Sequence, residues 1–440
     1  MPGQAPLEGK LLGPPTRGLG DDALLDPSEA VNGRYVHLDV TRICCIMCVV
    51  LSSFDERYAL MNTGFAWQWV LQILWLLCGI CFGLSDRSYA DYAGRLMKYL
   101  GVGLLVNWSA WVLNGWTWQT DVWGVPVQMM FVLNLIVVTA LLAPIKSFWV
   151  RPLLEEERRL PVASPTEDPI SAADSSRDKM LRAWLILGSG LIGIVLCSHL
   201  FLRPALIELI QAMHSRAEYF QIKEMMDPHQ SSTFAVELVC QLQVCAAALW
   251  ILVVSPLLFD KSLTAWMLFA NFYLHRAFLG LWRTDLFSNS FCLVMIAMVA
   301  CRFGLAKRRQ LGKLVHRYWF FIMWLAGMLW SPGFPGTDGA MPVKRYGLVP
   351  QTEADQLRMV KHFATEALLT MAWLTGGQHM VDKKIFTVDG LSWVNEWAVV
   401  AFLMHTGLRL LLGSPLGWVA LLAIGPVCWA SSRSSRSFEV

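Results

Sequence analysis

Long apolar runs, separated by short polar connections, repeat along the chain from residue 34 to its end. A helix that crosses the hydrocarbon core of a bilayer needs about 20 mostly apolar residues. Runs of about that length predict spanning helices that begin near Leu38, Gly64, Leu96, Val122, Ala183, Phe234, Leu263, Leu286, Arg317, Lys361, Asn395 and Pro415. The pattern therefore predicts an all-α, polytopic transmembrane helix bundle with roughly ten to twelve spanning helices. The last run, from Pro415 to Ala430, would either cross the membrane or lie in its interface.

The polar segments divide the chain further. Residues 1–33 are rich in Pro and Gly, contain no apolar core of the kind found in a cleavable signal peptide, and predict a flexible N-terminal tail. Residues 34–432 form the predicted transmembrane domain, and 433–440 a short tail. Within the domain, the charged, Pro- and Ser-containing segment 147–180 predicts a cytoplasmic linker, and the Pro- and Gly-containing segment 333–360 predicts a loop on the other side.

Basic residues predict the orientation of the chain, because cytoplasmic loops carry an excess of Lys and Arg. They are dense after the second, fourth and eighth predicted helices and at the C-terminus, whereas the connection after the third helix, residues 116–120, has none. All dense segments share one side if both termini are cytoplasmic, which requires an even number of spans. The segments hold Arg87, Arg95 and Lys98; Lys146, Arg151, Arg158, Arg159, Arg177, Lys179 and Arg182; Arg302, Lys307, Arg308, Arg309, Lys313 and Arg317; and Arg433 and Arg436.

Composition agrees with an integral membrane protein. Of the 440 residues, 55% are hydrophobic and only 16% are charged, and the mean hydropathy of +0.46 excludes a water-soluble globule and a disordered chain. The lipid bilayer is thus the first expected partner, although the sequence leaves open which membrane. A net charge of +3 gives no reason to expect a nucleic-acid partner.

Two C-x-x-C pairs, Cys45–Cys48 and Cys78–Cys81, have the spacing of zinc ligands. Both lie inside apolar runs, where a thiol packs as a small hydrophobic group, and a structural zinc site would place such pairs in a polar knuckle. We therefore predict no metal site.

Ionisable side chains inside the apolar runs are the main candidates for function, because each costs about 2.5–3.5 kcal/mol at the bilayer centre. They either form hydrogen bonds between helices or together line a polar cavity. The residues are Asp39, Arg42, Glu237, His275, Arg276, His362, Glu366, Glu396, His405 and Arg409.

The first predicted helix carries the most specific motif. Residues 34–54 read RYVHLDVTRICCIMCVVLSSF, and Leu38, Asp39 and Arg42 form a Leu-Asp-x-x-Arg run. With this opening the chain resembles the acyltransferase-3 family of integral membrane O-acyltransferases. It is also similar to transmembrane acetyltransferases that modify glucosamine.

Two further motifs extend this resemblance over roughly residues 34–430. Arg95 and Lys98, where the third helix begins, resemble the Arg-x-x-Arg motif of the family, and VAFLMHT places His405 in a late helix like one that ends in Leu-Ile-His. The resemblance implies transfer of an acyl group, in the first place acetyl, from acetyl-CoA or another acyl-CoA to a hydroxyl of a sugar or lipid acceptor. Arg42, Arg95 and Lys98 would then bind the phosphates of the acyl donor.

The chain departs from the family at one position. The family has a His eleven residues after the Arg, and this chain has Ser53 there, about 16 Å along the same helix face. A hydroxyl without a neighbouring base does not replace imidazole as general base. Either His37, His275 or His405 supplies the base, or the chain is a non-catalytic relative that keeps the scaffold. A third possibility is a transporter whose polar side chains line a pathway.

Overall fold

The structure is a computed structural model, and in the part of the chain that it describes the regular elements are all helices. The all-α class predicted from the sequence is thus confirmed for these residues. The described residues are 36–54, 67–85, 88–113, 127–147, 169–219, 228–259, 261–279, 287–303, 317–319, 321–322, 325, 364, 368, 370, 372 and 388–436.

The helices coincide with the predicted apolar runs with one exception, a helix over 203–219 that lies between the runs near Ala183 and Phe234, where no helix was predicted. Most residues of the runs near Arg317 and Lys361 lie outside the described part. The segments 1–33 and 333–360 lie outside it as well. The elements are α1 (Val36–Phe54), α3 (Trp67–Leu84), α4 (Tyr89–Leu113), α5 (Val127–Ile145), α7 (Pro169–Cys197), η5 (Ser198–Leu202), α8 (Arg203–Tyr219), α9 (Pro228–Leu258), α10 (Lys261–Leu279), α11 (Phe287–Phe303) and α14 (Val388–Arg436).

Two element boundaries differ from the sequence prediction. Helix α7 begins at Pro169 and so takes in residues 169–180 of the expected linker, and α14 continues to Arg436, inside the expected tail. Helix α14 also joins the last two predicted runs, with a kink at Gly413, whose φ of 74° favours glycine. Pro415 follows at once, so the chain turns here from one helical rod into a second.

Four of the described helices are long and apolar enough to cross a membrane, which indicates a membrane protein. They are Tyr89–Leu113, Asp178–Leu209, Val236–Leu258 and Trp393–Gly413. Shorter apolar helices cover Val70–Leu84, Met129–Ile145, Phe287–Cys301 and Pro415–Val427.

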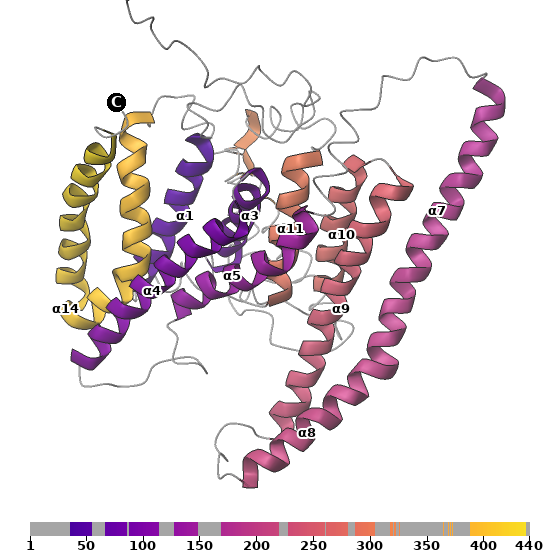
Figure 1. Cartoon of the computed structure of the whole chain (residues 1–440), viewed down its shortest axis with the longest axis horizontal. Helices are drawn as coiled ribbons and strands as arrows, with labels where there is room; N and C mark the ends of the chain where they lie inside the picture. The colour runs from indigo at the N-terminus through magenta and orange to yellow at the C-terminus, as the bar shows by residue number, and fades with distance from the viewer. Residues whose placement is uncertain are drawn as a thin grey trace, which may run out of the picture.

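The helices pack around two hydrophobic cores, and the helices of the first, such as α1 and α14, lie beside those of the second, such as α9 and α10, in Figure 1. The first core is built mainly by α1, α3, α4, α5 and α14 and includes Val40, Val50 and Ala401. The second is built by α3, α5, α7, α9, α10 and α11 and includes Leu252 and Val294. Helices α3, α5 and α11 contribute to both cores, since Ala297 and Cys301 of α11 belong to the first, and these three helices therefore join the two parts.

Helix α3 packs against α11 with the two chains running parallel. Gly79 lies against Val294 and Gly83 against Met298, so the residue numbers increase in the same direction along both helices. The approach is very close, because a Cβ added at Gly79 would lie 2.4 Å from the carbonyl oxygen of Val294. Glycine is therefore required at this crossing.

Helices α4 and α14 also run parallel, and α4 and α5 antiparallel. Asn107 of α4 donates to the carbonyl of Leu403 of α14, and Ala110, further along α4, lies against Gly407, further along α14. Between α4 and α5, the hydroxyl of Tyr89 donates to the carbonyl of Ile136, whereas Gly103 lies against Met129, so the order is reversed.

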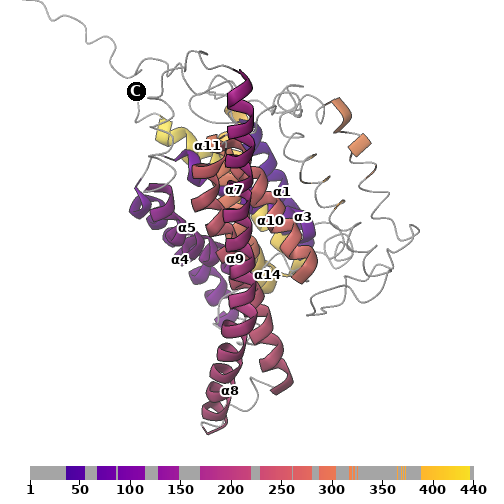
Figure 2. The ribbon, with the colours of Figure 1, turned by 90° about the vertical axis from the view of Figure 1, so that its right-hand side faces the viewer.

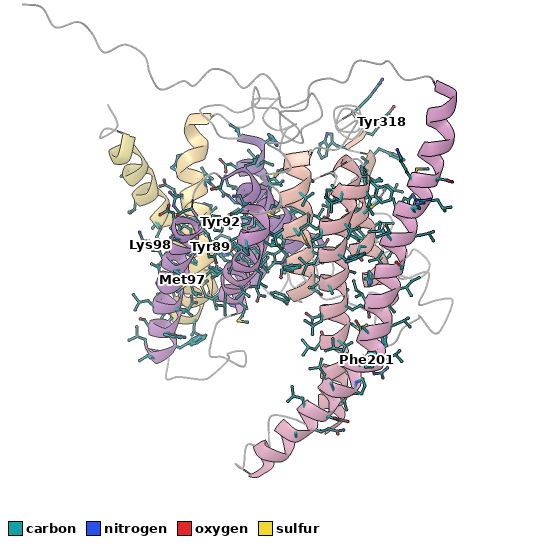
Figure 3. The ribbon with its side chains drawn as sticks, turned by 45° about the vertical axis from the view of Figure 1, so that its right-hand side comes forward. Tyr89, Tyr92, Met97, Lys98, Phe201 and Tyr318 are labelled. Carbon is teal, nitrogen blue, oxygen red and sulfur yellow. The ribbon has the colours of Figure 1, made fainter. Side chains whose placement is uncertain are left out.

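Helix α7 is the most exposed of the long helices, and the π-helix η5 links it to α8. The rod formed by α7, η5 and α8 runs the whole length of the view in Figure 2, and α8 projects beyond the other helices together with the start of α9. Phe201, in η5, is 71% exposed (Figure 3). Trp250 of α9 holds α7 by donating its indole N–H to the carbonyl of Leu187.

Candidate functional site

Arg42 is the centre of a polar cluster that joins α1 to α14. Its Nε donates to Oδ1 of Asn395 at 3.0 Å, and its Nη2 forms a salt bridge of 2.8 Å with Oδ1 of Asp39. The Nδ2 of Asn395 also donates to Oδ1 of Asp39 at 3.4 Å, which closes the triangle. We call Asp39, Arg42 and Asn395 the Arg42 cluster. Its members lie near the beginnings of α1 and α14, so these two helices start at the same end of the molecule.

The guanidinium of Arg42 is oriented by these contacts without being enclosed by them. The side chain of Arg42 is 31% exposed, and its Nη1 makes no hydrogen bond with a described residue. One edge of the planar fork is thus held by Asn395 and Asp39, and donors on the other edge remain available to a ligand. A fixed guanidinium of this kind suits a phosphate or carboxylate oxygen.

His405 is buried further along α14, with 2% of its surface exposed. Its Nδ1 lies 2.7 Å from the carbonyl oxygen of Phe402 and 3.3 Å from that of Ala401, so Nδ1 carries the proton. Nε2 is then the nitrogen with the lone pair, which is the atom that a general base uses. His405 comes ten residues after Asn395, a distance of about 15 Å along the helix axis.

Ser53 lies on α1 at nearly the same depth as His405. It comes eleven residues after Arg42, about 16 Å along α1. Arg42 and Asn395 are hydrogen-bonded and α1 packs against α14, so these two residues lie at the same height in the bundle. The distance from Arg42 to Ser53 along α1 can therefore be compared with the distance from Asn395 to His405 along α14. Of the proposed catalytic residues, the structure thus assigns Ser53 and His405 to neighbouring helices at similar depth.

His275 belongs to a different part of the molecule. It is half-buried on α10, and its Nδ1 lies 3.0 Å from the carbonyl oxygen of Asn271 on the same helix. Helix α10 packs against α9 and α11 in the second core, whereas His405 lies on α14 beside the first (Figure 1). The structure therefore does not bring His275 and His405 together.

Arg95 and Lys98 are both exposed on α4 and form no ion pair with a described residue. Between and beyond them lie exposed apolar side chains such as Met97 and Val102, so the two cations share their face with an apolar surface (Figure 3). Ser88 caps the start of this helix by accepting the N–H of Asp91. Neither cation joins the Arg42 cluster.

Lys146 has a role that sequence reasoning missed. The sequence predicts that it is one of the basic residues that mark the cytoplasmic side. In the structure its side chain is 6% exposed, and its ammonium group donates to the carbonyl oxygens of Phe82 and Ser85. The ammonium also lies 4.6 Å from the ring centroid of Phe82. It therefore caps the C-terminal end of α3, where a cation is favoured by the helix dipole. The sequence alone does not show whether a lysine at the end of an apolar run marks the cytoplasmic side or caps a neighbouring helix.

Within the described residues, no group of three or more His, Cys, Asp or Glu side chains could hold a metal ion. Comparison of the chain with protein-family models, with curated proteins and with solved structures finds no match.

Proposed function

We propose that the chain is a multi-pass membrane protein that crosses the bilayer at each predicted run and has both termini on the cytoplasmic side. The helix orientations support this topology. Helices α1, α4 and α14 are the first, third and eleventh runs and share one direction, while α3 and α11, the second and eighth, are parallel to each other. Helices α4 and α5, which are consecutive, are antiparallel. A chain that reverses direction at every run gives this pattern.

We further propose that the protein is a membrane-bound O-acyltransferase that uses an acyl-CoA. The observation that carries this proposal is the Arg42 cluster, in which a guanidinium is oriented by two partners and keeps donors for an anion. In this proposal the phosphates of the donor bind Arg42, and the pantetheine arm extends along α1 and α14 toward His405. Arg95 and Lys98 add positive charge on the same side of the membrane and raise the local concentration of the anionic donor.

The proposed reaction needs one base. Nε2 of His405 accepts the proton of the acceptor hydroxyl as its oxygen attacks the thioester carbonyl, the carbon–sulfur bond breaks, and the proton passes to the CoA thiolate. The acceptor is a hydroxyl of a sugar or lipid. Ser53 belongs to the neighbouring helix α1 and is the residue that stands where the resembled family has imidazole.

Substitution of Arg42 tests donor binding. We expect Arg42→Lys to leave expression unchanged and to weaken CoA binding to the purified, detergent-solubilised protein by about 1–3 kcal/mol, because an ammonium does not reproduce the fork. Arg182→Lys is the matched control, since Arg182 is exposed on α7, away from the cluster. Equal affinities of wild type and Arg42→Lys would remove the donor site from α1.

Substitution of His405 tests the chemistry. With acetyl-CoA as donor and a membrane extract as acceptor, we expect His405→Gln to retain CoA binding and to lower the release of free CoA by about 10²–10⁴-fold. Binding without turnover in the wild type would instead identify a non-catalytic relative. Solute flux across proteoliposomes without CoA binding would identify a transporter.

A further inference from the structure

Two buried cysteines meet between α9 and α11 in the second core. The side chains of Cys245 on α9 and Cys292 on α11 lie within hydrogen-bonding range of each other, and they are 9% and 1% exposed. Both are free thiols. A single buried thiol packs as a small hydrophobic group, whereas two thiols in contact across neighbouring helices are also placed to form a disulfide.

The packing of α9 on α11 supports this contact independently (Figure 1). The backbone N–H of Ser288 donates to Oε1 of Gln241 at 3.4 Å, so these two residues face each other across the two helices. Cys245 comes four residues after Gln241, and Cys292 comes four residues after Ser288. Four residues are about one helical turn, so each cysteine lies on the same face as the residue that precedes it by one turn. The two helices therefore run parallel, and their register brings the two thiols together.

The cysteine pair lies on a side of α11 that α3 does not cover. Val294 and Ala297 of α11 lie against Gly79 of α3. Cys292 precedes Val294 by two residues, which turns it about 200° around the helix axis, away from α3 and toward α9. A bond between Cys245 and Cys292 would therefore tie α11 to α9 and leave the close crossing of α3 and α11 unchanged.

Cys245 lies at the edge of the surface that α9 presents to the outside of the bundle. Leu242, three residues before it, is 41% exposed, and Ala246, directly after it, is exposed as well. This surface belongs to Val236–Leu258, which is long and apolar enough to cross a membrane. In the proposed topology lipid chains cover it, so a reagent that reaches Cys245 from this side must be apolar and uncharged. Cys292 is the more deeply buried of the two thiols.

We propose that uncharged organic hydroperoxides, such as oxidised lipid chains, convert Cys245 and Cys292 to a disulfide that links α9 to α11. The sulfur of Cys245 attacks the terminal peroxide oxygen, the oxygen–oxygen bond breaks, and the thiol proton passes to the alkoxide, which leaves as an alcohol. The sulfur of Cys292 then attacks the sulfenic sulfur of Cys245, and the hydroxyl leaves with the thiol proton of Cys292 as water. Two thiols are oxidised and one peroxide is reduced, a transfer of two electrons. The site is independent of the proposed acyl transfer, because the Arg42 cluster joins α1 to α14.

Peptide mapping of the purified, reduced, full-length protein tests the proposal. After treatment with cumene hydroperoxide, we expect a disulfide-linked pair of peptides that contain Cys245 and Cys292, and loss of most of the free thiol at both positions. Oxidised glutathione is charged and should produce several-fold less of this link. Absence of the link after treatment with cumene hydroperoxide would overturn the proposal, and so would a link that oxidised glutathione forms equally well.

Two variants test the separate roles of the thiols. In Cys292→Ala the sulfenic acid of Cys245 has no thiol to attack it, so Cys245 should accumulate as sulfinic acid, several-fold above its level in the wild type, as measured by the mass of its peptide. Cys240→Ala is the matched control, because Cys240 is another buried thiol of α9, with 6% exposure, and this variant should form the link as the wild type does. Equal sulfinic acid in Cys292→Ala and the wild type, or loss of the link in Cys240→Ala, would contradict the proposed pairing.

Discussion

The two cores of the molecule treat buried polar side chains differently. In the first core, around α1, α4 and α14, the buried polar residues include the imidazole of His405 and the amide of Asn107, which bonds to α14, and the partly exposed Arg42 cluster joins α1 to α14. The buried cation Lys146 follows α5 and lies against Phe82 of the second core, at the end of α3. Around α9, α10 and α11 the buried polar side chains are all neutral within the described residues. They bond to hydroxyl, thioether or amide groups, as Ser255 does to Thr264 and Met267, or remain unpartnered, as Asn271 Nδ2 does.

This difference indicates which core is expected to carry a functional site and which is expected to have a structural role alone. Burial of a charged or titratable group in an apolar interior costs free energy, so such groups are usually kept there for a function. The side of the molecule with Arg42 and His405 is therefore where catalysis or ligand binding is expected. The neutral side needs only packing and hydrogen bonds to be stable.

Replacing Lys146 by Met should be the most damaging of these changes. It removes the ammonium from the carbonyl oxygens of Phe82 and Ser85, and hydrogen bonds to a charged group contribute about 1.5–3 kcal/mol. We expect a loss of about 2–3 kcal/mol in unfolding free energy, measured by circular dichroism in detergent. Lys98→Met, at an exposed position of α4, should change it by less than about 0.5 kcal/mol. Equal losses in the two variants would show that the cap does not stabilise α3.

Replacing Gly79 by Ala tests the close approach of α3 and α11. The new Cβ would lie 2.4 Å from the carbonyl oxygen of Val294, and overpacking of this kind costs about 1–3 kcal/mol. Gly101→Ala is the matched control, because nothing lies within 4 Å of a Cβ at that position of α4. There we expect a gain of up to about 1 kcal/mol from helix propensity. Thermal unfolding of the two variants should therefore shift in opposite directions, and shifts of the same sign would contradict the observed packing.

The positions of the helices could be predicted from the sequence, whereas their pairing could not. An apolar run near Leu38 or Leu96 is long enough to dictate a helix, because run length and hydropathy are local properties. The contact between Arg42 and Asn395 joins residues 353 positions apart, and nothing in either run encodes its partner. The same holds for Lys146, whose burial depends on the end of α3 being nearby. The kink of α14 could be predicted in part. Gly413 and Pro415 mark in the sequence where the helix breaks, but they do not give the angle of the kink.

The candidate site could likewise be predicted only as far as single helices determine it. Asp39, Arg42 and His405 stood out as polar residues inside apolar runs, but the part of Asn395 in orienting Arg42 did not. Arg95 and Lys98 matched a motif and yet lie on an exposed face of α4, apart from the Arg42 cluster. Spacing along one helix predicts which residues share a face, whereas the union of two helices into one site is a tertiary property.

Replacing Asn107 by Ala compares a bond between helices with a bond within one. The Nδ2 of Asn107 donates to the carbonyl of Leu403 on α14 at 3.0 Å, and the side chain is fully buried. Because a polar bond between membrane helices contributes about 0.6–1.7 kcal/mol, we expect a loss of about 1 kcal/mol. Thr139→Val removes a hydroxyl that bonds only to α5 itself, and should cost less. A larger loss for Thr139→Val would refute the importance of the α4–α14 contact.

Replacing Asn395 by Ala should have the smallest effect on stability and the clearest effect on binding. Arg42 keeps its salt bridge with Asp39, and partly exposed pairs contribute little, so we expect a loss of at most about 1 kcal/mol. The guanidinium, however, loses the acceptor that holds its Nε, and the fork is no longer fixed for a phosphate. CoA affinity should therefore fall several-fold, as measured by equilibrium binding to the purified protein.

Asn271→Ala is the matched control. Asn271 is a buried amide on α10, in the second core, and the substitution keeps its backbone carbonyl, which His275 contacts. That variant should bind CoA as the wild type does, and an equal fall in both would mean that the loss of affinity reflects general loosening of the bundle and not the orientation of Arg42.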